Sequence, residues 1–286
     1  MPEPRILLVG LECGESPRWH DGRLWLANWG TQEVVAVDLE GESEVVTRVP
    51  TTLPYSIDWL PDGRLLIVSG QESLLLRMEP DATLVTHADV TGSDRAFNEI
   101  VVDGRGNTYV DGIGFDLMAG EEFAPGGITL VSPDGAAVRQ VADGIAFGNG
   151  MVVTPDNSTL IVAESYASRL TAFDIAADGS LSNRRVWADL GGGVPDGICL
   201  DAEGAVWYAD VPNKSCTRVR EGGEVLQRID LDRGCFACML GGPDGTTLFM
   251  LATEWRGPEH MNDGARTGRL LTVQAPAPAA GWPAST

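Results

Sequence analysis

The sequence lacks any apolar run long enough to cross a membrane. A transmembrane helix needs about 20 consecutive apolar residues, and no stretch of this 286-residue chain approaches that length. The first ten residues, MPEPRILLVG, carry a short apolar patch without the layout of a signal peptide. We therefore expect a cytoplasmic protein with no membrane partner.

Positive charge is also scarce. Lys and Arg number 20 against 41 Asp and Glu, which gives a formal net charge of −21. Such a chain repels the phosphates of nucleic acids and anionic lipids, so neither is an expected partner. The acidity favours solubility, and it would make an oxygen-lined pocket attractive to a divalent cation.

Cysteine is too sparse and too irregular for a disulfide framework. The five cysteines are odd in number and include one Cys-x-x-Cys, at Cys235 and Cys238. A single such pair, without a second pair or clustered histidines, is a weak signal for zinc or redox chemistry. Reduced, partly buried thiols are the better interpretation.

Glycine and proline, in contrast, are plentiful. The chain has 35 Gly and 17 Pro and shows no long segment with helical periodicity. This composition is typical of many short strands joined by turns. A chain of this length could form two domains, but all-β folds of this size are often single domains.

A unit of four strands repeats along the chain. The first two strands of each unit surround an Asp/Gly-type turn, a strong hairpin signal, and recur six times, at 16–28, 57–69, 100–110, 151–163, 198–209 and 239–251. A second hairpin follows in five copies. The sixth copy has only its first half, at 268–273, and residues 5–10 can supply the missing strand.

This arrangement predicts an all-β, six-bladed β-propeller with four-stranded blades, the last blade closed by the N-terminal strand. A β-sandwich or β-helix is the alternative, but sandwiches do not repeat a four-strand unit six times. We expect one domain over 1–286, with an irregular tail from about residue 275.

The repeat brings six positions into register where the innermost strands enter the channel. They are separated by 40, 43, 51, 47 and 41 residues and are occupied by Glu15, Tyr55, Asn98, Asn149, Asp196 and Ala237. Innermost strands of a propeller line its channel, so these side chains should converge. Four of the six carry side-chain carboxylates or carboxamides.

Oxygen donors of this kind suit a hard divalent cation, with water completing the shell. The sequence leaves Ca²⁺, Mg²⁺, Mn²⁺, Zn²⁺ and Fe²⁺ open. A plainer interpretation treats Asn149-Gly150 and Asp196-Gly197 as turns, with glycine supplying a positive φ. That interpretation does not account for Glu15, which has no turn preference.

Five motifs in order carry a resemblance that spans essentially the whole chain. They are GESPRW at 14–19, FNEIVVD at 97–103, GNGMVVTPD at 148–156, PDGICLDAEG at 195–204 and GGPDGTTL at 241–248. In these the chain resembles the SMP-30/gluconolactonase/luciferin-regenerating enzyme family. The resemblance implies a six-bladed propeller that holds one divalent metal ion in its channel and hydrolyses lactones.

Carried over by residue, the resemblance implies metal binding by Glu15, Asn149 and Asp196 and substrate binding by Asn98. The family often has an arginine two residues before that asparagine. Here the position is Ala96, with Arg95 one residue earlier, so Arg95 is the candidate substrate contact. The family's Asn-Asp pair reads Asn98-Glu99 in this chain.

A lactonase would polarise the ring-ester carbonyl with the metal and activate water with a carboxylate. Asp196 is the expected catalytic base, because the resemblance implies a double role for it; a second carboxylate from a loop could serve instead. We expect a small-molecule lactone as partner and a monomer or weak homo-oligomer.

Substrate choice should come from loops over the channel mouth. The longest repeat spacing contains a Gly-rich insertion at 111–127, which we interpret as a lid. The residues expected to line the mouth are Tyr55, Phe115, Glu121 and Trp255.

Other chemistries find less support. The chain has no Gly-x-Ser-x-Gly, and none of His20, His87 and His260 falls on the ring, so a nucleophilic hydrolase is not indicated. A non-catalytic propeller, acting as a calcium-binding or interaction scaffold, is the main alternative. A saturated metal shell and a blocked channel would mark a scaffold, whereas a ligand-sized cavity above an open site would mark an enzyme. A strictosidine-synthase-like chemistry is a third alternative, but it would need a different ring.

Overall fold

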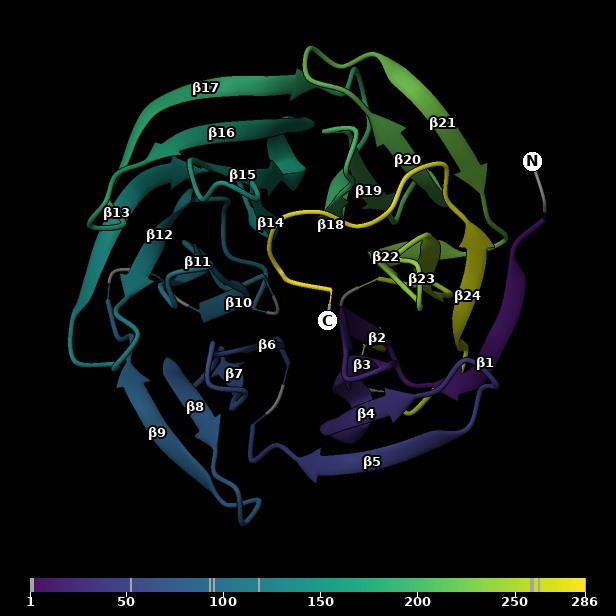
Figure 1. The fold of residues 1–286 in the computed structure, drawn as a ribbon, viewed down its shortest axis with the longest axis horizontal. Helices are drawn as coiled ribbons and strands as arrows, with labels where there is room; N and C mark the ends of the chain where they lie inside the picture. Colours follow the sequence, from purple (N-terminus) through teal and green to yellow (C-terminus); the bar gives the residue numbers. More distant parts are fainter. Residues whose placement is uncertain are drawn as a thin grey trace.

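Six antiparallel sheets surround a central channel in the computed structural model, which describes residues 3–51, 53–92, 94, 96–117, 119–257, 260–261 and 263–285. Each sheet has four strands, and the innermost strands stand around the channel (Figure 1). The predicted six-bladed, all-β propeller is confirmed.

The six blades follow the chain in order. Blade 1 contains β2 (Gly14–His20), β3 (Arg23–Asn28), β4 (Glu33–Val37) and β5 (Ser43–Arg48). Blade 2 contains β6 (Tyr55–Trp59), β7 (Leu65–Ser69), β8 (Leu74–Met78) and β9 (Leu84–Asp89). Blade 3 contains β10 (Ala96–Val102), β11 (Thr108–Ile113), β12 (Gly126–Val131) and β13 (Val138–Ile145). Blade 4 contains β14 (Gly148–Val153), β15 (Thr159–Glu164), β16 (Arg169–Ile175) and β17 (Leu181–Asp189).

Blade 5 contains β18 (Pro195–Leu200), β19 (Val206–Asp210), β20 (Ser215–Val219) and β21 (Val225–Asp230). Blade 6 contains β22 (Gly234–Gly241), β23 (Thr247–Thr253), β24 (Gly268–Gln274) and, from the other end of the chain, β1 (Arg5–Leu11). Two 3-10 turns, η1 (Trp29–Thr31) and η2 (Ser165–Ala167), follow the second strands of blades 1 and 4. No helix of the described residues is long and apolar enough to cross a membrane.

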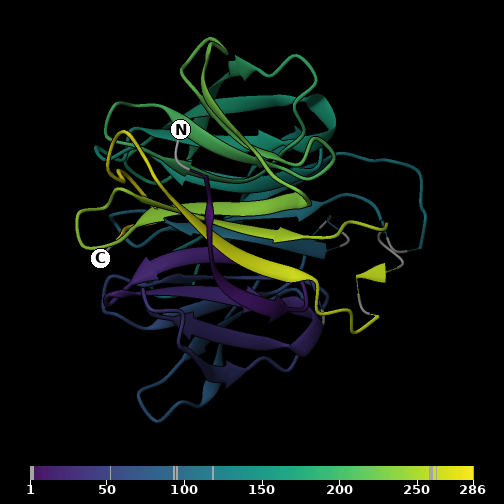
Figure 2. The ribbon, with the colours of Figure 1, turned by 90° about the vertical axis from the view of Figure 1, so that its right-hand side faces the viewer.

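Closure of the ring depends on the pairing of β1 with β24. The two strands run antiparallel from Arg5 opposite Thr272 to Leu11 opposite Gly268. They lie side by side in Figure 2, where the purple β1 runs beside the yellow β24. The prediction that residues 5–10 complete the last blade is therefore confirmed, and the pairing removes an exposed edge from blade 6.

Burial falls from the inner to the outer strands of each blade. The inner strands β6 and β10 are almost wholly buried, whereas the outer strands β5 and β17 are mostly exposed. The hydrophobic clusters lie between neighbouring blades, and they include fully buried large side chains such as Trp207 and Phe249. The apolar runs of the repeat thus serve as the surfaces on which blades stack.

Five of the six inner strands contain a bulge, and its position is what directs side chains into the channel. The register of the inner strand against its neighbour shifts in blades 1, 3, 4, 5 and 6, in each case between residues that bracket or include the ring position: Glu15/Arg18, Phe97/Ile100, Gly148/Met151, Pro195/Ile198 and Cys235/Ala237. Only β6 of blade 2 keeps continuous register, from Tyr55 to Trp59. A bulge bends its strand and re-aims the side chain at that point.

The C-terminal segment crosses one end of the channel (Figure 1). Trp282 exchanges two backbone hydrogen bonds with Val153, at the end of β14, and the Ala280 N–H donates to the Leu200 carbonyl at the end of β18. Because the ring residues stand at the starts of these same strands, the tail and the ring occupy opposite ends of the channel.

Candidate metal centre and cavity

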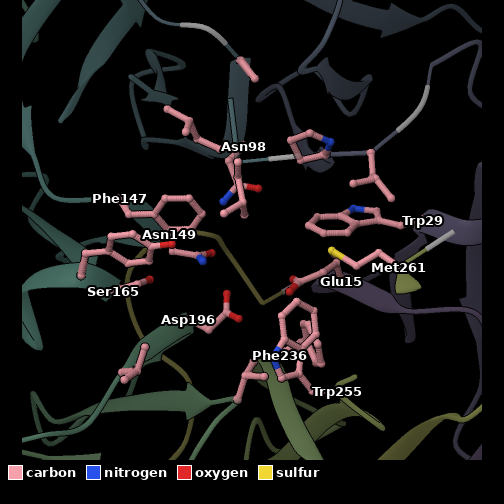
Figure 3. A pocket seen from close by; sticks show the side chains of 18 of the residues that line it. Glu15, Trp29, Asn98, Phe147, Asn149, Ser165, Asp196, Phe236, Trp255 and Met261 are labelled. Carbon is pink, nitrogen blue, oxygen red and sulfur yellow. The ribbon is translucent and has the colours of Figure 1, made fainter. Parts of the chain in front are cut away.

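A cavity of about 370 Å³ opens at the starts of the inner strands. Its lining includes four of the six ring residues: Glu15 from β2, Asn98 from β10, Asn149 from β14 and Asp196 from β18. Figure 3 shows their carboxylate and carboxamide groups turned toward a common centre. The side chains predicted from the register to converge, from blades 1, 3, 4 and 5, thus line one cavity.

Glycines beside the ring residues allow the inner strands to approach closely. A Cβ added at Gly197 would lie 2.6 Å from the Cβ of Ala237, and one added at Gly150 would overlap the backbone nitrogen of Ile198. The plainer interpretation of Asp196-Gly197 as a turn is wrong, since both residues lie within β18 and Gly197 is not among the glycines with positive φ. Gly197 is needed for contact between blades 5 and 6, which sets the position of Asp196.

Glu15 is buried with its carboxyl group facing the cavity. Its own Oε2 accepts a hydrogen bond of 2.8 Å from the Ser16 N–H, where Ser16 adopts a left-handed φ of 48° at the β2 bulge. Burial and, after it, repulsion from Glu99 raise the pKa of Glu15 to about 8. Ser16 and Arg18 offset only part of this shift, so the ionised form of Glu15 is poorly stabilised by the protein alone.

The ionised form of Asp196 is also poorly stabilised by the surrounding protein. Burial and repulsion from Glu15 and then Glu99 raise its pKa well above the usual value, although a hydrogen bond from Asn149 acts in the opposite direction. The chain enters β18 along a fixed path, because the Ser165 hydroxyl donates to the Pro195 carbonyl at 2.6 Å. Asp196 is thus held close to a second carboxylate, and the described side chains leave both incompletely neutralised.

This donor set fits a divalent cation. Two carboxylates that repel each other and one carboxamide converge in a single cavity, and a positive ion between them would remove the repulsion. No three His, Cys, Asp or Glu side chains of the described residues are grouped so as to hold a metal ion. A cation here would therefore use the Asn149 carboxamide as well as the two carboxylates.

A second layer of charge lies beneath the ring. Arg18 donates through Nη2 to Glu99 Oε1 at 2.9 Å and to the Ile100 carbonyl at 2.8 Å. The same Glu99 oxygen accepts a hydrogen bond of 2.9 Å from the Ile100 N–H. Glu99, which stands next to Asn98 in β10, is thus tied to blade 1, and this holds blades 1 and 3 together under the candidate metal ligands.

Tyr55 does not line the cavity, contrary to the expectation from register. Its ring is fully buried in the core between blades, and its hydroxyl donates to the Asn28 carbonyl at 2.9 Å. The physical reason is the regular pairing of β6: without a bulge, the Tyr55 side chain keeps the ordinary strand direction and points away from the channel.

The remaining predicted contacts divide between the cavity and its surroundings. Phe115 and Trp255 line the cavity. Glu121 is exposed and does not line it; its Oε2 accepts a hydrogen bond from the Asp116 N–H at 2.9 Å. Arg95 lies outside the described residues.

The predicted lid over 111–127 is shorter than expected. Residues 111–113 belong to β11 and residues 126–127 to β12, which leaves a loop of 114–125. Phe115, Asp116 and Leu117 of that loop line the cavity.

Most of the cavity wall was not foreseen from the sequence. Apolar and aromatic side chains dominate it, among them Trp29, Phe147, Tyr166, Phe236 and Met261 (Figure 3). A signal was available for two of these residues, because Trp29 and Tyr166 both lie in the 3-10 turns that follow the second strand of a blade. The three histidines are absent from this wall.

Comparison with known proteins agrees with the resemblance found in the motifs. A family model described as "SMP-30/Gluconolactonase/LRE-like region" matches residues 13–254. The chain belongs to this family. Regucalcin of Xenopus laevis is 26% identical over 286 residues, which cover 94% of this chain and 94% of that protein. Human regucalcin is 27% identical and covers 94% of this chain and 92% of its own length.

Solved structures of family members share the architecture. A luciferin-regenerating enzyme superposes with a TM-score of 0.83 at 17% identity, over 99% of this chain and 100% of the other. A gluconolactonase from Xanthomonas campestris gives a TM-score of 0.77 at 21% identity, over 96% of each chain. At these identities the structural likeness establishes the fold alone.

Proposed function

We propose that this protein is a divalent-metal-dependent hydrolase that opens the ring of a small lactone. The observation that carries the proposal is the position of two mutually repelling carboxylates, Glu15 and Asp196, at a cavity of about 370 Å³. That volume is within the range of roughly 300–1,000 Å³ that holds small ligands. A family relative named gluconolactonase gives the reaction class.

Glu15, Asn149 and Asp196 would hold the cation. When bound, a divalent cation would polarise the lactone carbonyl and offset the negative charge that develops on its oxygen. The three protein ligands come from blades 1, 4 and 5, so their separation is set by the packing of the inner strands rather than by a flexible loop.

Asp196 is the carboxylate that would take the proton of the attacking water. Asp196 is partly exposed, whereas Glu15 is buried. Asn98 also lines the cavity, and its uncharged carboxamide offers an NH2 donor group and a carbonyl acceptor, which suits the orientation of the lactone ester.

Asp116 is the loop carboxylate that could serve as base instead. It lines the cavity from the 114–125 loop, but its Oδ1 accepts a hydrogen bond from the Ala119 N–H at 2.9 Å. Asp116 is exposed, whereas Asp196 is partly buried at the ring.

A non-catalytic, calcium-binding or interaction scaffold is the second candidate. The relatives named regucalcin, one of which is described as a calcium-binding protein, favour it. A scaffold has no use for a ligand-sized cavity beside its cation, so the open cavity favours the hydrolase.

The test is an activity screen of the protein reconstituted with each of Ca²⁺, Mg²⁺, Mn²⁺, Zn²⁺ and Fe²⁺ against sugar lactones and simple γ- and δ-lactones. We expect turnover of at least one lactone, with a loss of at least a hundredfold in Asp196→Ala. Thermal unfolding of the variant checks that it is folded. The proposal fails if no lactone is turned over with any cation, or if the variant is as active as the parent.

A further inference from the structure

One side of the cavity is lined by the aromatic rings of Phe115, Phe147 and Tyr166, on which Phe123 packs; we call these four residues the aromatic wall. Phe147 and Tyr166 stack with centroids 4.8 Å apart and planes at 14°. Phe115 contacts both of them, at 5.8 Å and 6.0 Å, and Phe123 packs on Tyr166 at 5.4 Å. The wall joins the 114–125 loop of blade 3 to the 3-10 turn of blade 4.

The backbone at Phe147 is arranged to support this wall. Phe147 has a φ of 57°, which is uncommon for a bulky residue and unfavourable in energy. Two hydrogen bonds hold the turn in place: Ser165 N–H to the Phe147 carbonyl at 3.0 Å, and Tyr166 N–H to the Ala146 carbonyl at 3.1 Å. The strained turn therefore keeps Tyr166 against Phe147, which lies two residues before Asn149.

Aromatic rings also line the other side of the cavity. Phe236 and Trp255 pack edge to face at 5.8 Å, and Trp29 stands next to them across Met261 (Figure 3). The indole nitrogen of Trp29 already donates to the Tyr55 carbonyl at 2.6 Å, so the part of Trp29 left for a ligand is apolar.

Several of these rings are open to solvent. Tyr166 is 53% exposed, Phe123 is 48% exposed and Trp255 is 42% exposed. They are the most exposed aromatic side chains of the described residues, and they gather at the mouth of one cavity. Clustered exposed apolar surface of this kind marks a binding site for an apolar ligand.

Among the described lining residues, polar groups for a sugar are few. Apart from the candidate metal ligands and the hydroxyl of Tyr166, the polar side chains in this described part of the lining are Gln71, Asn98, Asp116 and Ser165. Gln71 donates to the Leu53 carbonyl at 3.4 Å, Ser165 donates to Pro195 as described above, and Asp116 binds the Ala119 N–H. No Lys or Arg is among the described lining residues.

A polyhydroxylated lactone would therefore bury hydroxyl groups against hydrocarbon. Each hydroxyl that leaves water without a new partner weakens binding. An alkyl or aryl group in the same place would instead gain affinity from burial against the rings.

We propose that the substrate is a lactone with an apolar alkyl or aryl substituent, and that the aromatic wall selects it over sugar lactones. This proposal rests on the proposed function for the reaction, but the preference itself belongs to the cavity wall. The substituent packs on Phe147 and Tyr166 while the ester faces the carboxylates.

Binding can be tested without turnover, using lactams that resist hydrolysis. The probes are 6-pentylpiperidin-2-one and D-glucono-δ-lactam, titrated with Ca²⁺ present and with EDTA, and followed by calorimetry and tryptophan fluorescence. We expect the alkyl lactam to bind at least tenfold more tightly. Each further methylene in the chain should add about fourfold until the cavity is filled.

Three variants locate the preference. Tyr166→Ala, at a largely exposed position, should weaken alkyl-lactam binding about tenfold and leave sugar-lactam binding unchanged, whereas Tyr166→Phe should retain it. Val186→Ala removes an equally exposed apolar side chain, 56% exposed on β17 and outside the cavity, and should change neither affinity.

The outcomes separate the two proposals. Equal or tighter binding of the sugar lactam, or an alkyl-lactam affinity unaffected by Tyr166→Ala, overturns the substrate proposal whatever the activity screen shows. Tight alkyl-lactam binding without turnover of any lactone of the screen, δ-decalactone and dihydrocoumarin included, under any cation supports the apolar preference and overturns the lactonase proposal. Faster turnover of these two lactones than of D-glucono-δ-lactone supports both.

Discussion

Arg18 of blade 1 and Glu99 of blade 3 form a buried ion pair across the channel, with Nη2 and Oε1 2.9 Å apart and both side chains under a tenth exposed. Breaking such a pair by removing one member leaves an uncompensated buried charge, which costs about 3–5 kcal/mol. We expect Arg18→Met and Glu99→Gln each to reduce the free energy of unfolding by an amount in this range.

The double variant is the informative control. With both charges removed, Arg18→Met/Glu99→Gln should be clearly more stable than the sum of the single changes predicts, and denaturant unfolding measures all three. Additive losses would mean that the two side chains stabilise the fold independently.

Removal of the candidate ligands should abolish stabilisation by a divalent cation. At a concentration of a hundred times Kd, a ligand adds about 2.7 kcal/mol to the stability of the folded state. For a chain of this size we expect an increase in Tm of roughly 5–10 °C in calorimetry against EDTA. Glu15→Gln and Asp196→Asn should lose this cation-dependent increase in Tm, because each variant removes one negative charge from the site.

Glu121→Gln is the matched control, since this carboxylate is exposed and lies outside the cavity lining. It should keep the full cation-dependent increase in Tm. A cation effect that survives in both Glu15→Gln and Asp196→Asn would show that the cation binds elsewhere.

Asp58, buried in β6 beneath the ring, should give the stability a specific pH dependence. Burial raises its pKa to about 6, against the opposing effects of Arg18 and of N–H donors from Val102 and Trp59. The folded state therefore binds the Asp58 proton more tightly than the unfolded state does. Protonation of Asp58 therefore adds to the free energy of unfolding. This contribution is complete below about pH 4 and is lost as the pH rises through about 6.

Asp58→Asn removes this dependence. The difference in unfolding free energy, parent minus variant, should fall by roughly 2.5 kcal/mol between pH 4 and pH 7, as the shift of about two pKa units implies. Urea unfolding at intervals of half a pH unit measures it. A difference that stays constant, or rises with pH, would contradict the raised pKa.

The cysteines should be inert in the folded protein. All five are free and buried, and burial raises the pKa of the Cys13, Cys199 and Cys238 thiols. A thiol reagent at pH 8 should react with none of them within minutes, and with all five once the protein is unfolded in guanidinium. Rapid labelling of even one thiol in the native protein would refute this.

The architecture could be predicted from the sequence because its signal is repeated. Asp/Gly turns between apolar runs recur six times, and one misjudged copy is corrected by the other five. The same repetition made the ring residues predictable, because each occupies the same register position in a different blade: Glu15, Asn98, Asn149 and Asp196.

The direction of the Tyr55 side chain could not be predicted from the repeat. Register gives the position of a residue along its strand, but a bulge decides which way the side chain points, and β6 has none. A bulge depends on local backbone geometry, such as the positive φ of Ser16. The pattern of residue types does not predict that geometry. The aromatic wall was missed for a related reason: Phe147 and Tyr166 meet through hydrogen bonds between two loops that lie on different hairpins.

The pairing of β1 with β24 has a consequence for how the protein is made. Blade 6 contributes Ala237 to the ring and no charged group, yet it stands between blade 5, which carries Asp196, and blade 1, which carries Glu15. Of the strands of the propeller, the outer strand β1 is synthesised first and its partner β24 is synthesised last. Through most of synthesis the growing chain therefore has an open arc in which the two carboxylates are not yet held together. A cation site made of Glu15, Asn149 and Asp196, as proposed above, would be complete only once β24 has paired with β1.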